Sequence, residues 1–160
     1  MLTNGEKAPD FTLVAAGAAS HTLAEYVGRP LVLFFFRGRF CPTSKRYLIQ
    51  WQELDRKVHN LGARLVAISY DTLENHAWMA DRYDIRFPLL SDPDLTISRA
   101  YGVYIDRHEE GFEHGEPGIV ILDREGSVAY SLLASGPKGF SGPGDILPIL
   151  IYMFVHDGKY

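Results

Sequence analysis

The feature that most constrains the fold is an unbroken apolar run from Leu31 to Phe36, which follows Pro30 and ends at an Arg-Gly-Arg sequence. A strand with one face in water alternates apolar and polar residues, whereas a strand covered on both faces is apolar throughout. The run therefore predicts a central strand of a sheet with other elements packed on both faces.

The segments after this run alternate between helical and strand patterns. Apolar residues at three- and four-residue spacing predict a helix over residues 42–60, and residues 65–70 form a second apolar run. A helix capped by Asp71 or Thr72 and ending near Tyr83 is expected next. The other expected elements are a strand at 11–14, a helical turn at 23–26, a strand at 87–90, a short helix at 95–102, strands at 118–122 and 127–133, and a final helix capped by Asp145.

The order of these elements predicts a single α/β domain over residues 1–160. Strand–helix–strand units require parallel strands with right-handed crossovers, while the turn at 123–126 joins an antiparallel hairpin. We therefore expect a mixed central sheet with helices on both faces. The polar stretch 103–117 and the Gly/Pro-rich stretch 135–144 are expected to be loops.

Composition and charge exclude several functional classes. The formal net charge of −4 gives no basic surface for nucleic acid and no polybasic patch for a membrane. The longest apolar stretch, residues 146–155, is too short to span a bilayer and is expected to form a buried helix. The N-terminal residues lack the pattern of a signal peptide, so a cytoplasmic location is the default expectation.

The chain contains one cysteine, Cys41, which cannot form an intrachain disulfide and fits a reducing compartment. Cys41 directly precedes Pro42, and proline is favoured at the first position of a helix, so we expect Cys41 to be the helix N-cap. Its sulfur would then face the N–H groups of Thr43 and Ser44. These groups and the positive end of the helix dipole would favour the thiolate over the thiol.

Positive charge near Cys41 in the sequence would favour the thiolate further. The cations are Arg37, Arg39, Lys45 and Arg46. The alternative is that Cys41 is an inert core residue, since free cysteine is among the most buried residue types. The strand end, the expected N-cap and the cations together favour a reactive thiol.

Several segments match one known family in order and spacing. They are GEKAPDFTLVAA at 5–16, LVLFFFRGRFCPTS at 31–44, LVAISYD at 65–71, FPLLSDPDLTISRAYGVY at 87–104 and PGIVILDREGSVAYS at 117–131. Together they resemble the alkyl hydroperoxide reductase C/thiol-specific antioxidant (AhpC/TSA) family, the peroxiredoxins, which have the thioredoxin fold.

The resemblance implies a thiol peroxidase with a thioredoxin-like fold. Cys41 would attack a peroxide O–O bond as the thiolate and become a sulfenic acid. The partners implied are a peroxide substrate and an external thiol reductant, namely thioredoxin, glutaredoxin or glutathione. No metal or bound cofactor is implied, and a homodimer is the candidate assembly.

The chain departs from the family pattern at positions that matter for this chemistry. The family has a proline seven residues and a threonine three residues before its cysteine, where this chain has Phe34 and Gly38. The family's activating arginine matches Pro117, a position at which thioredoxins have a cis proline beside the cysteine. Ser44 replaces the second cysteine of a thioredoxin-like Cys-Pro-x-Cys loop.

These departures predict one-cysteine chemistry, in which an external thiol or another chain's Cys41 resolves the sulfenic acid. Arg37 and Arg39 are the candidates to replace the missing arginine, and solvated loop charges are the alternative interpretation of both. Thr43 or Ser44 is the candidate to supply the missing hydroxyl. The alternative function is a thioredoxin-fold binding module or redox sensor without peroxidase turnover.

Two further groups of polar residues are not interpreted as catalytic. The histidines and glutamates at 108–114 match no helical zinc motif and are interpreted as a surface loop. Asp71 and Asp92 are interpreted as a helix cap and a turn residue rather than as catalytic acids.

Overall fold

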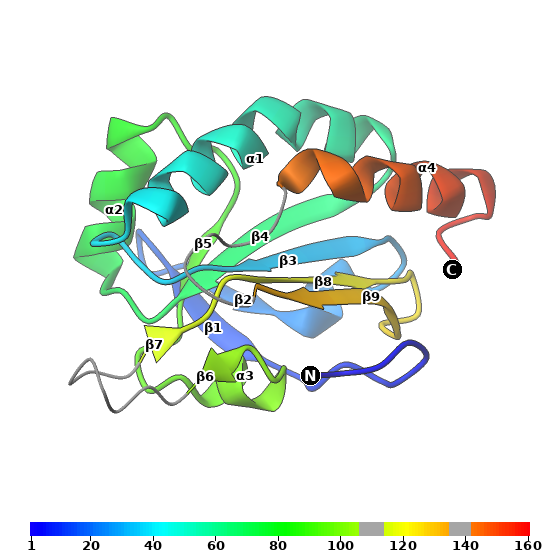
Figure 1. Cartoon of the computed structure of the whole chain (residues 1–160), viewed down its shortest axis with the longest axis horizontal. Coiled ribbons are helices and arrows are strands. Elements are labelled where there is room, and N and C mark those ends of the chain that lie inside the picture. Colours follow the sequence, from blue (N-terminus) through cyan, green and yellow to red (C-terminus); the bar gives the residue numbers. More distant parts are fainter. Residues whose placement is uncertain (106–113, 135–141) are drawn as a thin grey trace.

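A computed structural model describes residues 1–105, 114–134 and 142–160. The main sheet consists of β1 (Thr12–Ala15), β2 (Ser20–Thr22), β3 (Leu31–Phe35), β4 (Arg64–Ser69), β5 (Leu89–Ser91), β8 (Gly118–Leu122) and β9 (Val128–Leu133). Its strand order is β2-β1-β5-β4-β3-β8-β9 (Figure 1). Strand β4 pairs in parallel with β3 and β5, and the other neighbours are antiparallel. The predicted mixed sheet is confirmed.

Helices cover both faces of this sheet. They are α1 (Pro42–Asn60), α2 (Leu73–Arg82), α3 (Thr96–Ala100), α4 (Leu147–Val155) and the 3-10 turns η1 (Leu23–Tyr26) and η3 (Pro143–Ile146). Helices α1 and α4 lie on one face, and α3 lies on the opposite face (Figure 1). This arrangement confirms the expected α/β architecture.

Strand β3 supplies the centre of both hydrophobic cores, because its successive side chains point to opposite faces. On the α1 face, the Phe34 ring centroid lies 5.9 Å from Trp51 and 6.0 Å from Tyr47. On the opposite face, the ring of Phe35 lies 5.4 Å from that of Tyr101. All five side chains are buried, which explains why the sequence of β3 shows no polar alternation.

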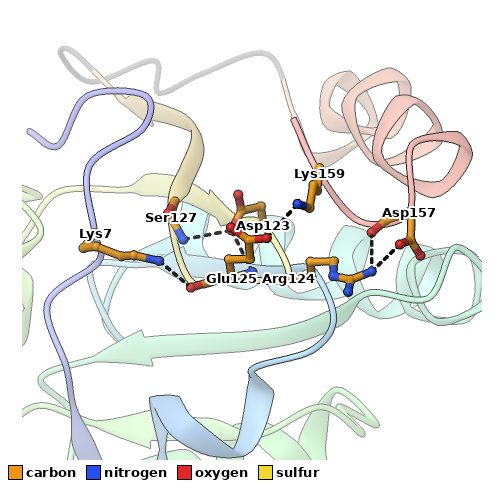
Figure 2. Close-up of polar contacts among 7 residues, drawn as sticks. All are labelled: Lys7, Asp123, Arg124, Glu125, Ser127, Asp157 and Lys159. Carbon is orange, nitrogen blue, oxygen red and sulfur yellow. Dashed lines mark hydrogen bonds and ion pairs between the residues drawn. The ribbon is translucent and has the colours of Figure 1, made fainter.

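Segments near both ends of the chain contact the β8–β9 turn (Figure 2). This turn lies next to the first residue of β3, whereas Cys41 follows the last one. Arg124 forms an ion pair with the carboxylate of Asp157. The Nζ atom of Lys159 lies 2.7 Å from Glu125 Oε1, and Lys7 Nζ donates to the Glu125 carbonyl at 2.8 Å. Because exposed ion pairs contribute little to stability, these contacts are expected to add little to the free energy of folding.

Two local expectations near the loops are corrected. Residues 103–117 are not a simple loop as expected, because β6 (Tyr104–Ile105) pairs with β7 (His114–Gly115) as a short antiparallel ladder. The rest of that stretch, 106–113, and the stretch 135–141 of the other expected loop lie outside the described residues. Asp145 does not cap the last helix, because Pro143 begins a 3-10 turn that contains Asp145, and Ile146 is the N-cap of α4.

Helix α4 is not fully buried, contrary to expectation. Leu150 and Met153 face the core, while Ile151, Phe154 and Val155 are exposed, because α4 lies at the outer edge of its layer with one side unpacked. Within the described parts of the chain, no helix is both long enough and apolar enough to cross a bilayer.

The position of Phe34 in the α1-side core gives a direct test of the fold. Phe34→Ala is expected to lower the free energy of unfolding by about 3–5 kcal/mol, since it leaves a cavity among buried aromatic rings. Phe154→Ala is the matched control, because Phe154 is 57% exposed. Urea denaturation of both variants measures the difference. Equal losses would contradict the central placement of β3.

Candidate active site around Cys41

Cys41 lies where the loop that follows β3 enters α1. Its backbone angles, φ −93° and ψ 116°, are those of an extended N-cap residue, and Pro42 begins the helix. The Lys45 N–H donates to the Cys41 carbonyl at 3.3 Å, which is the first hydrogen bond of α1. The predicted N-cap is therefore confirmed. The Cys41 side chain is buried, and the residue is 8% exposed.

The expected contacts of the Cys41 sulfur with the N–H groups of Thr43 and Ser44 are wrong. The Cys41 side chain makes no capping hydrogen bond in the structure. Sulfur is a weak hydrogen-bond acceptor, which is consistent with the missing capping bond. The position of Cys41 at the N-terminus of α1 is what remains of the expected arrangement.

Ser44 occupies the first turn of α1 on the same side as Cys41, since residues three apart are neighbours on a helix. Ser44 is 1% exposed, and its Oγ has no hydrogen-bond partner. Thr43, next to it, is partly exposed. A buried hydroxyl without a partner is costly, so Ser44 provides an unused polar group beside the cysteine.

Asp71 connects the end of β4 to the cysteine loop. Its Oδ2 accepts hydrogen bonds from the Arg39 backbone N–H at 2.9 Å and from the Ser69 hydroxyl at 3.0 Å. Its Oδ1 accepts from the side-chain amide of Asn75 at 3.3 Å. His76 Nε2 lies 2.8 Å from Ser69 Oγ, so the polar chain runs from the cysteine loop into the core.

Burial affects the titration of His76 at the inner end of this chain of hydrogen bonds. Desolvation lowers the pKa of His76, while the charge of Asp71 and the backbone of Leu89 act in the opposite direction. Because the Ser69 hydroxyl donates to Asp71, the Nε2–H of His76 is the donor to Ser69 Oγ. The His76 Nδ1 atom is buried and has no hydrogen-bond partner.

Gly38 lies where the loop crosses Asp71. Its φ of +126° is unfavourable for any other residue, and a Cβ there would lie 2.9 Å from Asp71 Oδ2 and 3.1 Å from Tyr70 Cε1. The threonine of the family pattern therefore cannot be restored at this position without moving the loop. The loop of this chain follows a path that suits glycine alone.

The two arginines of the loop point to different parts of the molecule. The Arg37 guanidinium forms an ion pair with the buried Glu116, with Nη2 2.8 Å from Oε1. The Arg39 guanidinium lies 3.9 Å over the ring of Trp78 and donates to Asn75 Oδ1 at 3.0 Å. The structure thus places Arg37 beside the segment that enters β8 and Arg39 against α2.

Pro117 follows Glu116 directly, so Arg37 reaches the segment in which the family arginine was expected. The expected cis proline is wrong, because the described residues, which include the Glu116–Pro117 bond, contain no cis peptide bond. Backbone hydrogen bonds hold the chain on both sides of this bond. Glu116 N–H donates to the Val103 carbonyl, and Ala134 N–H donates to the Pro117 carbonyl, both at 2.8 Å.

The sequence interpretation missed the role of Asp71. Thr72 is the cap of α2, since its side chain accepts from the Asn75 N–H at 3.2 Å, and Asp71 is left to hold the loop. A signal was available, because the carboxyl ends of neighbouring parallel strands meet at one edge of a sheet. Asp71 and Cys41 each follow such a strand.

Most of the His/Glu-rich stretch at 108–114 lies outside the described residues, which include only His114 of it. Among the residues that the structure does describe, no group of three or more His, Cys, Asp and Glu side chains could hold a metal ion.

The contact between Gly38 and Asp71 predicts a cost specific to this glycine. Gly38→Ala is expected to destabilise the protein by more than the roughly 1–3 kcal/mol of backbone strain alone, because its methyl group meets the Asp71 carboxylate. Gly28→Ala is the matched control, since Gly28 has φ +100° and open space around its Cβ position. Urea denaturation measures the free energy of unfolding of both variants. Equal losses would contradict the close contact between position 38 and the Asp71 carboxylate.

The burial of His76 predicts a dependence of stability on pH. Because its folded-state pKa lies below the ordinary value of 6.5, the unfolded chain binds the additional proton as the pH falls through that value. Stability therefore declines below about pH 6.5, by at most about 1.4 kcal/mol per pH unit. His76→Gln removes this component, and replacement of the exposed His59 by Gln keeps it. The free energy of unfolding is measured by urea denaturation at several pH values below 6.5. If wild type and both variants lose stability equally per pH unit, the prediction is contradicted.

Comparisons with known proteins agree on one family. Residues 4–131 match the family model described as AhpC/TSA family. A peroxiredoxin of Thermoplasma volcanium is 34% identical over 141 residues, which are 84% of this chain and 67% of that protein. Among solved structures, the peroxidoxin BcpB of Mycobacterium tuberculosis has a TM-score of 0.81 at 19% identity, with 98% of both chains covered.

A cysteine-to-serine mutant of PrxQ from Xylella fastidiosa has a TM-score of 0.83 at 19% identity, again with 98% of both chains covered. At this identity the likeness concerns the fold alone, and it confirms the predicted thioredoxin-like architecture. The sequence match covers most of the chain, including Cys41 and Asp71. The chain therefore belongs to the AhpC/TSA family.

Proposed function

We propose that the protein is a one-cysteine thiol peroxidase that reduces hydrogen peroxide or organic hydroperoxides through Cys41. The observation that carries this proposal is the placement of the chain's only cysteine at a helix N-cap, within an AhpC/TSA-family fold. The thiolate is the nucleophilic form of cysteine, and the N-terminus of a helix attracts negative charge.

The reaction proceeds in two stages. The Cys41 thiolate attacks one peroxide oxygen, so that an S–O bond forms and the O–O bond breaks. The leaving oxygen takes a proton and departs as water or an alcohol, and Cys41 becomes a sulfenic acid. An external thiol then displaces water from the sulfur to form a mixed disulfide, and a second thiol releases reduced Cys41.

Arg37 is the first candidate for the cation that stabilises the leaving oxygen. Its ion pair with Glu116 brings the guanidinium next to Pro117, where the family pattern has an arginine. Arg39 is the second candidate, with its guanidinium over Trp78. Positive charge at the leaving oxygen lowers the barrier, because the negative charge develops there in the transition state.

Ser44 is the candidate for the hydroxyl that the family threonine would provide. Its buried Oγ has no partner, and it lies in the first turn of α1, three positions after Cys41. In this position the hydroxyl can donate to an oxygen added to the Cys41 sulfur. The partly exposed Thr43 is the second candidate for this role.

Further parts of the proposal concern the surroundings of the reaction. The reductant is thioredoxin, glutaredoxin or glutathione, and the protein acts in the cytoplasm as a single thioredoxin-like domain, with a homodimer as the candidate assembly. A lone cysteine supports the intracellular reductant, since a chain with one thiol depends on other molecules to resolve it.

A redox sensor, or a binding module of the same fold, is the second candidate function. The observation that favours it is the burial of Cys41 together with the glycine at position 38, which excludes the family threonine. A sensor would be oxidised by peroxide without sustained turnover. A binding module would leave Cys41 reduced.

Steady-state peroxide consumption tests the proposal. With thioredoxin and its reductase, glutaredoxin with glutathione, or glutathione alone, the wild-type protein is expected to consume peroxide continuously in at least one system. Cys41→Ser is expected to consume none above background. A wild-type rate equal to that of Cys41→Ser would contradict the peroxidase, and a single oxidation without turnover would favour the sensor.

The place of Ser44 predicts that one substitution changes the chemistry. Ser44→Cys puts a second thiol at three-residue spacing from Cys41, within reach of a disulfide. Peroxide is then expected to produce an intrachain disulfide, detected as the loss of two hydrogens by intact mass. Thr43→Cys is the control, since side chains two residues apart at the start of a helix do not face each other. A stable sulfenic acid in Ser44→Cys would show that the two side chains do not meet.

A further inference from the structure

The cysteine loop is attached to the start of α2 at several points. The Arg39 N–H donates to Asp71 Oδ2, and the Arg39 guanidinium donates to Asn75 Oδ1 while it covers Trp78. Gly38 passes so close to Asp71 that a Cβ would meet its carboxylate at 2.9 Å. Both ends of Arg39 and the residue before it are thus held by one short segment of chain.

Asp71 is itself rigidly held. The residue is buried, and its carboxylate accepts from Ser69, whose hydroxyl is in turn bonded to the buried His76. Its own N–H donates to Ser69 Oγ at 3.2 Å, and its carbonyl accepts from the Ser91 hydroxyl of β5 at 2.6 Å. A side chain fixed by several buried hydrogen bonds is a precise anchor for a neighbouring loop.

We propose that Asp71 is the positioning residue of the active site, which holds Cys41 in its reactive place through the backbone N–H of Arg39. The link to Cys41 is short, because the Cys41 N–H donates to the Gly38 carbonyl at 3.2 Å and closes a turn over the anchored residues. This inference rests on the proposed peroxidase function. A shift of about 1 Å in a reacting atom can cost roughly 100-fold in rate.

The role assigned to Asp71 is that of a hydrogen-bond acceptor rather than a charge. A carboxylate near Cys41 repels the thiolate, so its charge alone would oppose the reaction. Asp71→Asn keeps an oxygen for the Arg39 N–H and removes the charge, whereas Asp71→Ala removes both. The two variants therefore separate positioning from electrostatics.

Asp92 provides a matched control at the neighbouring strand. It follows β5, is 1% exposed, and accepts hydrogen bonds from the Ile97 N–H at 3.1 Å and the Ser98 N–H at 2.8 Å. Its carboxylate holds α3 rather than the cysteine loop. Asp92→Ala therefore removes a buried carboxylate of the same kind from the same edge of the sheet.

The experiment measures two reactions of Cys41 in each variant. Asp71→Ala is expected to slow oxidation by stoichiometric hydrogen peroxide about 10- to 100-fold. It is also expected to speed alkylation by iodoacetamide, because the loop that keeps Cys41 buried is released. Asp71→Asn is expected to stay within about threefold of wild type in both reactions. Asp92→Ala is not expected to combine slower oxidation with faster alkylation of Cys41.

Two results would overturn the proposal. One is an Asp71→Ala protein whose two rates match those of Asp92→Ala. The other is an Asp71→Asn protein as slow in oxidation as Asp71→Ala, which would assign the effect to charge. If Asp71→Ala does not fold, Asp71→Ser replaces it, since the shorter side chain cannot reach the Arg39 N–H and the same opposite changes are expected.

A separate readout keeps this inference distinct from the proposed function. Hydrogen exchange of the Arg39 amide, followed by NMR in the reduced protein, requires no peroxide. Exchange is expected to be at least about tenfold faster in Asp71→Ala than in wild type, Asp71→Asn or Asp92→Ala. If wild-type protein does not react with peroxide, only the proposed peroxidase function is contradicted. If Asp71→Ala leaves the exchange rate of the Arg39 amide unchanged, the proposed role of Asp71 in holding the loop is contradicted.

Discussion

The hydrogen bond from the Arg39 N–H to Asp71 joins the loop after β3 to the end of β4, and the geometry around Cys41 depends on it. Parallel strands bring their carboxyl ends to one edge of the sheet, but they do not fix the loops that leave it. Here the anchor is a buried carboxylate supported by Ser69, which is bonded in turn to the buried His76. The cysteine is consequently presented by a rigid framework rather than by a free loop.

The departures from the family pattern form one consistent arrangement. Gly38 lacks the hydroxyl of the family threonine because its backbone must pass against Asp71 with φ +126°. Pro117 lacks the guanidinium of the family arginine, but Arg37 comes to the same segment through Glu116. Ser44 replaces a second thiol and leaves a buried hydroxyl without a partner near Cys41. These placements support the proposal that Arg37 and Ser44 replace the lost arginine and threonine, whereas nothing in the sequence replaces the second thiol.

Much of the fold followed from local sequence patterns, whereas the site depended on contacts between distant segments. The apolar run of β3 and the spacing in α1 indicated a covered strand and a helix that begins after Cys41, and both are confirmed. Asp71 lies thirty-two positions from Arg39, and no periodicity links them. The backbone on either side of the Glu116–Pro117 bond likewise has partners distant in the sequence, the Val103 carbonyl and the Ala134 N–H.

The central claim, that Cys41 is a peroxide-reactive thiol in a one-cysteine enzyme, is tested most directly by intact mass spectrometry. Reduced protein would receive one equivalent of hydrogen peroxide at neutral pH, with Cys41→Ser treated in parallel. The account predicts that wild-type protein gains one oxygen atom at Cys41 within seconds to minutes, and that an added thiol reverses the change. A wild-type Cys41 that remains a free thiol under these conditions would contradict it.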